Sequence, residues 1–173
     1  MVAAMSTLPA RLQALTLAAV ELEAVFGACR DGRENAAIQP TYDNTGSLRL
    51  LTFDSNGNGR PDTWSHMEGS RIVRIEIDAD EDGAIDRWEY YDSNQELEKV
   101  GTARTRGGGI ARSEFYEGGV LARAEEDTDG NGMVDKWETY ANGVMASVAF
   151  DTEGAGRPTR WIEYERASGT RKR

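Results

Sequence analysis

Acidic and amide side chains occupy alternate residues in two twelve-residue segments of the chain. In segments 78–89 and 127–138, oxygen-bearing side chains stand at positions 1, 3, 5, 9 and 12, and a glycine stands at position 6. Carboxylates on alternate residues of a tight turn can converge on one point, and glycine lets the backbone bend around it. Oxygens arranged in this way are the ligands of a hard divalent cation such as Ca²⁺, which takes six to eight of them.

The predicted calcium ligands in each segment are side-chain oxygens and one backbone carbonyl. The first site takes Asp78, Asp80, Asp82, the carbonyl of Ala84, Asp86 and Glu89. The second site takes Asp127, Asp129, Asn131, the carbonyl of Met133, Asp135 and Glu138. A third segment keeps Asp54, Asn56, Asn58 and Asp62 but ends in Ser65, so weaker binding is expected there.

Both full segments resemble the calcium loop of EF-hand proteins at every ligand position. An EF-hand has a helix on each side of the loop, whereas residues 72–77 and 88–91 have the composition of strands. The closer resemblance is therefore to DxDxDG calcium repeats of extracellular proteins, such as those of thrombospondin type 3. In a strand the pleat fixes the direction of each side chain, so Glu89 and Glu138 are ligands only if the pleat directs them toward the loop.

A column of tryptophans shows that these loops belong to a tandem repeat. Trp64, Trp88, Trp137 and Trp161 are separated by 24, 49 and 24 residues, so the gap of 49 holds two periods with Ser113 in the column. The loops of the five repeats begin at residues 54, 78, 103, 127 and 151. Position 6 of every loop is glycine: Gly59, Gly83, Gly108, Gly132 and Gly156. A period of this length indicates stacked units that share a core.

Each repeat carries the pattern of a β-hairpin. One apolar column stands six residues before the loop (Leu48, Ile72, Leu97, Leu121, Met145), and another stands three residues before it (Leu51, Ile75, Val100, Ala124, Val148). Their opposite parity requires either a bulge or two partly covered faces. In the stretch 72–77, simple alternation predicts Val73, Ile75 and Ile77 on one face. A second strand with the tryptophan follows the loop, and Gly or Asn turns lead to the next repeat.

The sequence therefore predicts a mainly β fold, in which tandem hairpins of 24–25 residues form an extended antiparallel sheet or an open solenoid of about ten strands. A closed barrel or propeller is the topological alternative, because periodicity does not state closure. The array covers residues 30–165, and a basic tail follows at 166–173.

Residues 1–29 allow two interpretations. Leu12, Leu15 and Leu22 have helical spacing, which predicts an amphipathic N-terminal helix. Alternatively, Cys29 follows an apolar stretch and the residues Phe-Gly-Ala, which resemble a loose bacterial lipobox, so that the segment would be a degenerate lipoprotein signal with a lipid anchor at Cys29.

Composition and motifs limit the function classes. Thirty acidic against twenty basic side chains give a net charge of −10, which repels nucleic acid and attracts divalent cations. The chain has a single histidine, His66, and no nucleophile elbow, phosphate loop or HExxH motif. From these features we expect that the chain is not an enzyme.

Two functions are expected from the repeat. The first is a calcium-binding β-repeat module with a structural or adhesive role in the bacterial cell envelope, in the periplasm, at the outer membrane or outside the cell. The alternative is a protein-binding scaffold whose hairpins are similar to MORN-variant repeats, with a partner on the exposed sheet face and incidental metal. The loop at 103 has lost its acidic ligands inside the loop but keeps Gly108 and Ile110, so we expect calcium to stabilise selected loops rather than to be needed for the fold.

Overall fold

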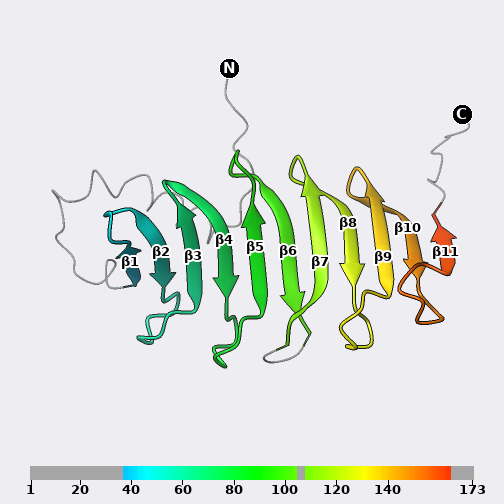
Figure 1. Ribbon diagram of the computed structural model, residues 1–173, viewed down its shortest axis with the longest axis horizontal. Helices are drawn as coiled ribbons and strands as arrows, with labels where there is room; N and C mark the ends of the chain where they lie inside the picture. Colours follow the sequence, from blue (N-terminus) through cyan, green and yellow to red (C-terminus); the bar gives the residue numbers. More distant parts are fainter. Residues whose placement is uncertain (1–36, 105–107, 165–173) are drawn as a thin grey trace, which may run out of the picture. The chain divides into compact units, whose positions relative to one another are not determined.

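The computed structural model describes residues 37–104 and 108–164, and these residues form β-strands joined by turns and loops (Figure 1). The strands are β1 (Ile38–Tyr42), β2 (Leu48–Phe53), β3 (Thr63–Glu68), β4 (Arg71–Ile77), β5 (Arg87–Tyr91), β6 (Leu97–Ala103), β7 (Ile110–Glu117), β8 (Val120–Glu126), β9 (Lys136–Ala141), β10 (Val144–Phe150) and β11 (Arg160–Glu163). The expected mainly β architecture is confirmed. The predicted helix or signal, Cys29 and the basic tail lie outside the described residues.

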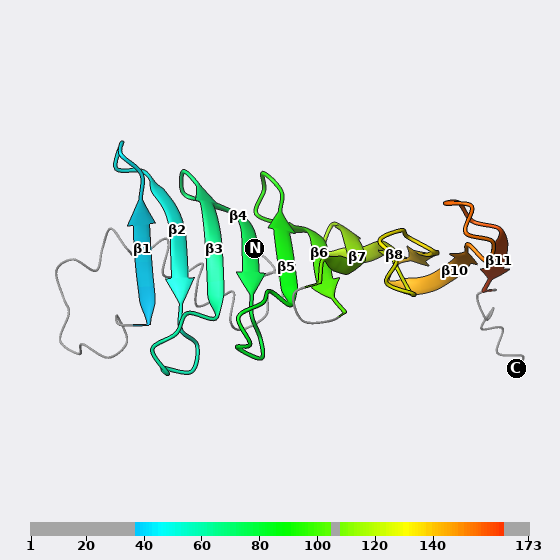
Figure 2. The same cartoon turned by 60° about the horizontal axis from the view of Figure 1, so that its bottom comes forward.

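All eleven strands follow sequence order in one open sheet, and each pair for which a register is given is antiparallel. The sheet is therefore open, and the closed barrel that the periodicity allowed is not formed. The chain divides into two compact units, of which the first ends at Arg71 and the second begins at Ile72. Strands β4 to β6 of the second unit lie side by side in both ribbon views (Figures 1 and 2). The part of the chain that the structure describes contains no helix able to span a membrane.

A β-bulge in the hairpin explains the two apolar columns of opposite parity. Glu89 lies opposite Val100, but the register then shifts so that Tyr91 lies opposite Leu97. Equivalent shifts occur where β1 pairs with β2, β7 with β8 and β9 with β10. Because each bulge adds one residue, two apolar side chains three residues apart reach the same face of the sheet.

The alternation predicted for β4 is wrong. The buried side chains of this strand are Ile72 and Ile75, three residues apart, while Val73 and Ile77 are half-buried. Alternation of period two therefore does not describe the burial of this strand.

The core of the second unit is a row of side chains that alternates between apolar and acidic. Across neighbouring strands, Val100 lies between Glu89 and Glu114, and Ala124 lies between Glu114 and Glu138. We call the side of the sheet that carries this row the ladder face. The row is formed by Ile75, Glu89, Val100, Glu114, Ala124, Glu138 and Val148. Its apolar members are buried.

In the second unit the tryptophans lie on the side of the sheet opposite to the ladder face. The repeat in which Ser113 replaces tryptophan is packed differently. Gly101 lies between Trp88 and Ser113 in the pairing of β5, β6 and β7. A β-carbon on Gly101 would come within 2.7 Å of the Ile110 side chain. Ile110 therefore packs on Gly101 in the repeat where Ser113 replaces tryptophan.

The turns between repeats have the conformations that their residues predict. Asn142 and Gly143 both have positive φ, of 53° and 75°, as a type I′ hairpin turn requires. In a longer turn, Asp92 Oδ1 accepts the N–H groups of Asn94 and Glu96 at 2.8 Å each. All repeat loops then fall at the other end of the hairpins, where each loop joins an even-numbered strand to the next odd-numbered one.

Candidate metal loops

Glycine at position 6 has the left-handed backbone conformation that the pattern predicts. The φ angles are 88° at Gly59, 91° at Gly83, 88° at Gly132 and 69° at Gly156. A residue with a β-carbon is strained at such angles. In these four loops the backbone conformation therefore explains the glycine.

The carboxylate of the aspartate at position 1 accepts hydrogen bonds from backbone N–H groups of its own loop. In the loop at 127, Asp127 Oδ1 accepts the N–H of Gly130 at 2.7 Å, and Oδ2 accepts the N–H of Gly132 at 2.8 Å. Burial alone would raise the pKa of Asp127, but these backbone hydrogen bonds outweigh it and lower the pKa. Asp54, Asp78 and Asp151 accept the same position-6 N–H in their own loops.

Positions 3 and 5 each accept a backbone N–H two residues further along. Asp80 Oδ1 accepts from the N–H of Asp82 at 3.2 Å, and Asp82 Oδ1 accepts from the N–H of Ala84 at 2.9 Å. Asp129 and Asn131 make the equivalent bonds in the loop at 127. These Asx turns wind the loop. The carboxylate of Asp82 does not join the group in which Asp78, Asp80 and Asp86 converge.

The acid at position 9 closes the loop across its base. Asp86 Oδ2 accepts the N–H of Ala79 at 2.7 Å, and Asp135 Oδ1 accepts the N–H of Thr128 at 3.0 Å. In the last loop the hydroxyl of Thr159 accepts the equivalent N–H at 2.9 Å. A neutral side chain can therefore supply this closing bond, and the bond alone does not explain the two aspartates.

Two trios of carboxylates converge in the second unit. One oxygen from each of Asp78, Asp80 and Asp86 lies within 4.8 Å of the others, and the same holds for Asp127, Asp129 and Asp135. Ligands at 2.3–2.6 Å from one Ca²⁺ can be up to about 5 Å apart, so one ion can bridge each trio. These two trios are the ones found among the described residues, and they belong to the two loops that match the full pattern.

The remaining predicted ligands are those at positions 5 and 7 of the two full loops and those of the loop at 54. Asp82 and Asn131 lie in their loops through the turns described above, and the carbonyls of Ala84 and Met133 follow at position 7. In the first unit, Asp62 is buried and its Oδ2 accepts the N–H of Ser55 at 2.9 Å. The first loop keeps the conformation, with Asp54, Asn56 and Asn58 accepting loop N–H groups.

The glutamates at position 12 are turned into the sheet. Glu89 is 4% exposed, and it accepts Arg87 Nε at 2.7 Å and the Tyr91 hydroxyl at 2.7 Å. Glu138 is 5% exposed, and it accepts Lys136 Nζ at 2.7 Å and the Tyr140 hydroxyl at 2.8 Å. The structure brings neither glutamate into the trios, because the pleat directs both to the ladder face.

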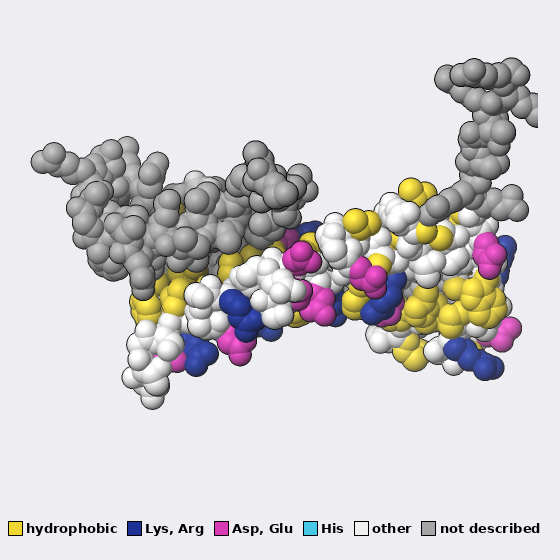
Figure 3. Space-filling model, turned by 90° about the horizontal axis from the view of Figure 1, so that it is seen from above, with side chains coloured by type: hydrophobic (Ala, Val, Ile, Leu, Met, Phe, Trp, Pro, Cys, Tyr) yellow, Lys and Arg dark blue, Asp and Glu magenta, His cyan; other side chains and the backbone are white. Residues whose placement is uncertain are grey.

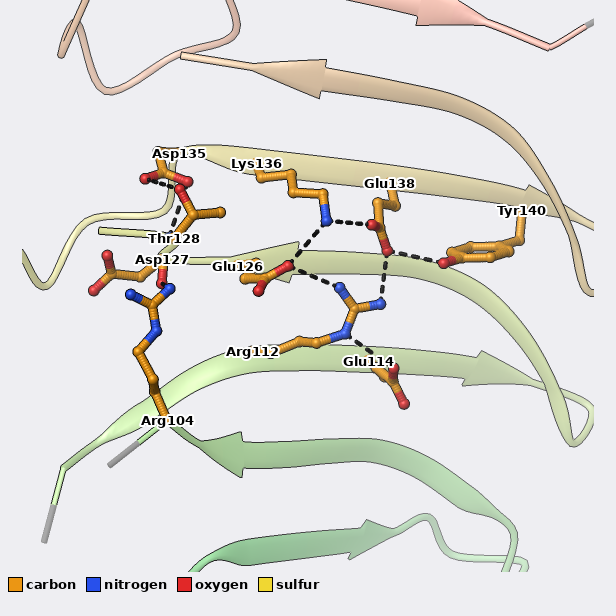
Figure 4. Close-up of polar contacts among 10 residues, drawn as sticks. All are labelled: Arg104, Arg112, Glu114, Glu126, Asp127, Thr128, Asp135, Lys136, Glu138 and Tyr140. Carbon is orange, nitrogen blue, oxygen red and sulfur yellow. Dashed lines mark hydrogen bonds and ion pairs between the residues drawn. The ribbon is translucent and has the colours of Figure 1, made fainter. Parts of the chain in front are cut away.

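Arg112 is the central base of this face, and the spacing of the loop residues did not predict its role. Its guanidinium bonds Glu114 at 3.0 Å, Glu126 at 3.1 Å and Glu138 at 2.6 Å, so it joins β7, β8 and β9 (Figure 4). Burial lowers the pKa of Arg112, but its carboxylate partners outweigh this effect and raise it. The signal was a basic-x-Glu-x-Tyr pattern at 87–91, 112–116 and 136–140.

This network removes an alternative account of the loop aspartates. The basic residues at position 10 could have paired with loop carboxylates of neighbouring repeats. Instead, Arg87 bonds Glu89, and Lys136 bonds Glu126 and Glu138. The basic side chains at these positions serve the ladder face rather than the trios.

No protein-family pattern and no curated protein matches the chain. Among solved structures, TarM matches with 11% identity and a TM-score of 0.45, covering 66% of this chain and 22% of TarM. A GtfA/B complex bound to UDP and GlcNAc matches with 12% identity and a TM-score of 0.35, covering 80% and 25%. Accessory secretory protein 1, 2 and 3 in Streptococcus pneumoniae matches with 14% identity and a TM-score of 0.33, covering 73% and 20%.

These neighbours contradict the expectation that the chain is not an enzyme, because TarM and GtfA/B are glycosyltransferases. That expectation rested on missing motifs, and a repeat sheet can form part of an enzyme without carrying its catalytic residues. The chain spans about a fifth to a quarter of the length of these neighbours. The likeness assigns no activity to this chain.

Proposed function

We propose that the second unit is a calcium-binding β-repeat module that serves a structural or adhesive role in the bacterial cell envelope. The observation that carries the proposal is the convergence of Asp78, Asp80 and Asp86 and of Asp127, Asp129 and Asp135 in two loops of the same conformation. Backbone N–H groups already donate to these carboxylates, and a cation between the three would offset the repulsion that remains among them.

The remaining ligands of each ion come from the loop and from solvent. Asp82 or Asn131 at position 5 and the carbonyl of Ala84 or Met133 at position 7 add to each trio. Because Glu89 and Glu138 are committed to the ladder face, the bidentate ligand of an EF-hand is replaced by water. The affinity should therefore lie in the range of extracellular modules, with dissociation constants of about 10⁻⁴ to 10⁻³ M.

Weak binding of this kind suits an environment with abundant calcium, which is why we place the module in the envelope. An ion that binds only the folded loop stabilises the fold by mass action. At a free calcium concentration of about ten times the dissociation constant, each site adds about 1.4 kcal/mol. Calcium would thus stiffen the repeat array without being needed to form its strands.

Thermal melts in millimolar calcium and in chelator test the proposal. We expect a higher midpoint with calcium for the native chain and no calcium-dependent shift for the double variant Asp80→Ala, Asp129→Ala. Asp92→Ala is the matched control, because it removes a similar turn acceptor at the other end of a hairpin. That control should melt lower yet keep its calcium shift. An unchanged midpoint for the native chain in calcium would rule the proposal out.

A protein-binding scaffold is the second candidate, and exposed apolar side chains favour it. Val144 is 65% exposed and Trp161 is 61% exposed in the second unit. Apolar side chains also gather toward the β9–β11 end of the face seen in Figure 3. If the melts show no calcium effect, this second candidate becomes the better account of the sheet.

A further inference from the structure

We infer that Arg104 lowers the calcium affinity of the loop at 127–138, so that the loop at 78–89 fills first. The inference rests on the calcium binding proposed above and makes the two sites unequal. Arg104 stands at position 2 of the degenerate loop at 103 and belongs to the repeat before the second site.

The guanidinium of Arg104 lies against the first residues of that site. Its Nη2 donates to the backbone carbonyl of Asp127 at 2.9 Å. Its Nη1 would be 3.9 Å from a β-carbon built on Gly130. Figure 4 shows Arg104 extending from the end of β6 toward Asp127, with Asp135 beyond it. A fixed positive charge therefore stands beside the position that a divalent ion would take.

The formal charges of the two loops differ in the same direction. The stretch 78–86 contains five acidic side chains, which are Asp78, Asp80, Glu81, Asp82 and Asp86. The stretch 127–135 contains three, because glycine and asparagine stand at positions 4 and 5. With Arg104 beside it, the second loop presents the smaller negative charge. Ligand charge is one of the factors that sets calcium affinity in such loops.

Arg104 could instead raise the affinity, if its bond to the Asp127 carbonyl prepared the loop for the ion. Asp127 already has three backbone N–H groups on its own carboxylate, and Asp135 closes the loop base. The loop conformation is thus fixed by its own residues, as it is in the loop at 78. The charge of Arg104 is therefore the feature that distinguishes it from a neutral residue such as Ser55 at the same position of the first loop.

Calcium titration calorimetry on single-site backgrounds tests the inference. Asp80→Ala leaves the second loop as the full site, and Asp129→Ala leaves the first. Arg104→Gln keeps a hydrogen-bond donor without the charge, and a unit charge near a divalent ion changes binding by about threefold to tenfold at low salt. We expect that gain in the Asp80→Ala background, no change in the Asp129→Ala background, and a smaller gain at high salt.

Arg104→Lys is the matched variant, because it keeps the charge but not the planar donor pair. The calcium affinity of the second loop should be the same with Arg104→Lys as with the native Arg104. The inference is overturned if Arg104→Gln binds calcium equally or more weakly at the second loop while both loops still bind. If neither background binds calcium, the proposed function itself fails, and this inference fails with it.

Discussion

At the scale of single residues, spacing predicted which side chains are candidate metal ligands but not which of them the fold brings together. The aspartates at positions 1, 3 and 9 converge because all three lie in one loop. The Asp, Asn and Gly residues of that loop determine its turns. Glu89 and Glu138 fit the same pattern, yet each lies in a strand and is bonded by a base and a tyrosine. The spacing could not show this, because the pleat depends on pairing with distant residues.

Glu138 should give the fold a specific sensitivity to acid. Burial raises its pKa, but hydrogen bonds from Arg112, Lys136 and Tyr140 outweigh burial and hold the pKa at about 2. Because the pKa is depressed in the folded state, the stabilisation is complete above the ordinary value of 4.5 and is lost as pH falls toward about 2. In chelator, Glu138→Gln should lose up to about 3 kcal/mol of unfolding free energy at pH 7.

The measurement is denaturant unfolding of both proteins between pH 7 and pH 2. The two stability curves should approach each other below pH 4.5. A constant difference across the whole range would show that Glu138 contributes through packing rather than through its charge.

At the scale of elements, the sequence predicted two strands and one loop in each repeat. It also predicted that either a bulge or a second covered face must explain why Leu97 and Val100, three residues apart, are both apolar. The structure shows the bulge, since Tyr91 faces Leu97 after a register shift. The choice could not be made from the sequence, because a bulge is a property of two paired strands.

Gly101 and Ile110 should behave as one packing unit of β6 and β7. Gly101→Ala places a β-carbon 2.7 Å from Ile110 and should cost about 1–3 kcal/mol of unfolding free energy. The double variant Gly101→Ala, Ile110→Ala should recover part of the loss expected from adding the two single effects. Urea unfolding of the four proteins measures the coupling. Additive effects would contradict the close packing of these two residues.

At the scale of the whole molecule, the hairpin order of the strands followed from the repeat, but their exact number and the closure of the sheet did not. The array covers residues 38–163 as eleven strands in sequence order, one more than the ten expected, because β1 is the second half of an incomplete repeat. No local sequence feature predicts whether the first and last strands pair, because closure depends on the twist accumulated over all strands. The N-terminal helix or signal and Cys29 lie outside the described residues.

The ion pairs of Arg112 on the ladder face should contribute to the stability of the second unit. Arg112→Met leaves Glu114 without its ion pair and leaves Glu126 and Glu138 with Lys136 alone, and it should cost about 3 kcal/mol of unfolding free energy. Urea unfolding in chelator measures this loss without a contribution from metal. Arg157→Met is the control, since Arg157 is exposed in the last loop and should change stability by less than about 0.5 kcal/mol. Equal effects of the two variants would show that the row is only a surface network.

Calorimetric counting of bound calcium tests the central claim most directly. The native chain should bind ions in the millimolar range. Asp80→Ala and Asp129→Ala should each abolish one site, and the double variant should lose both. Absence of binding by the native chain at millimolar calcium, or a stoichiometry that the double variant leaves unchanged, would contradict the account.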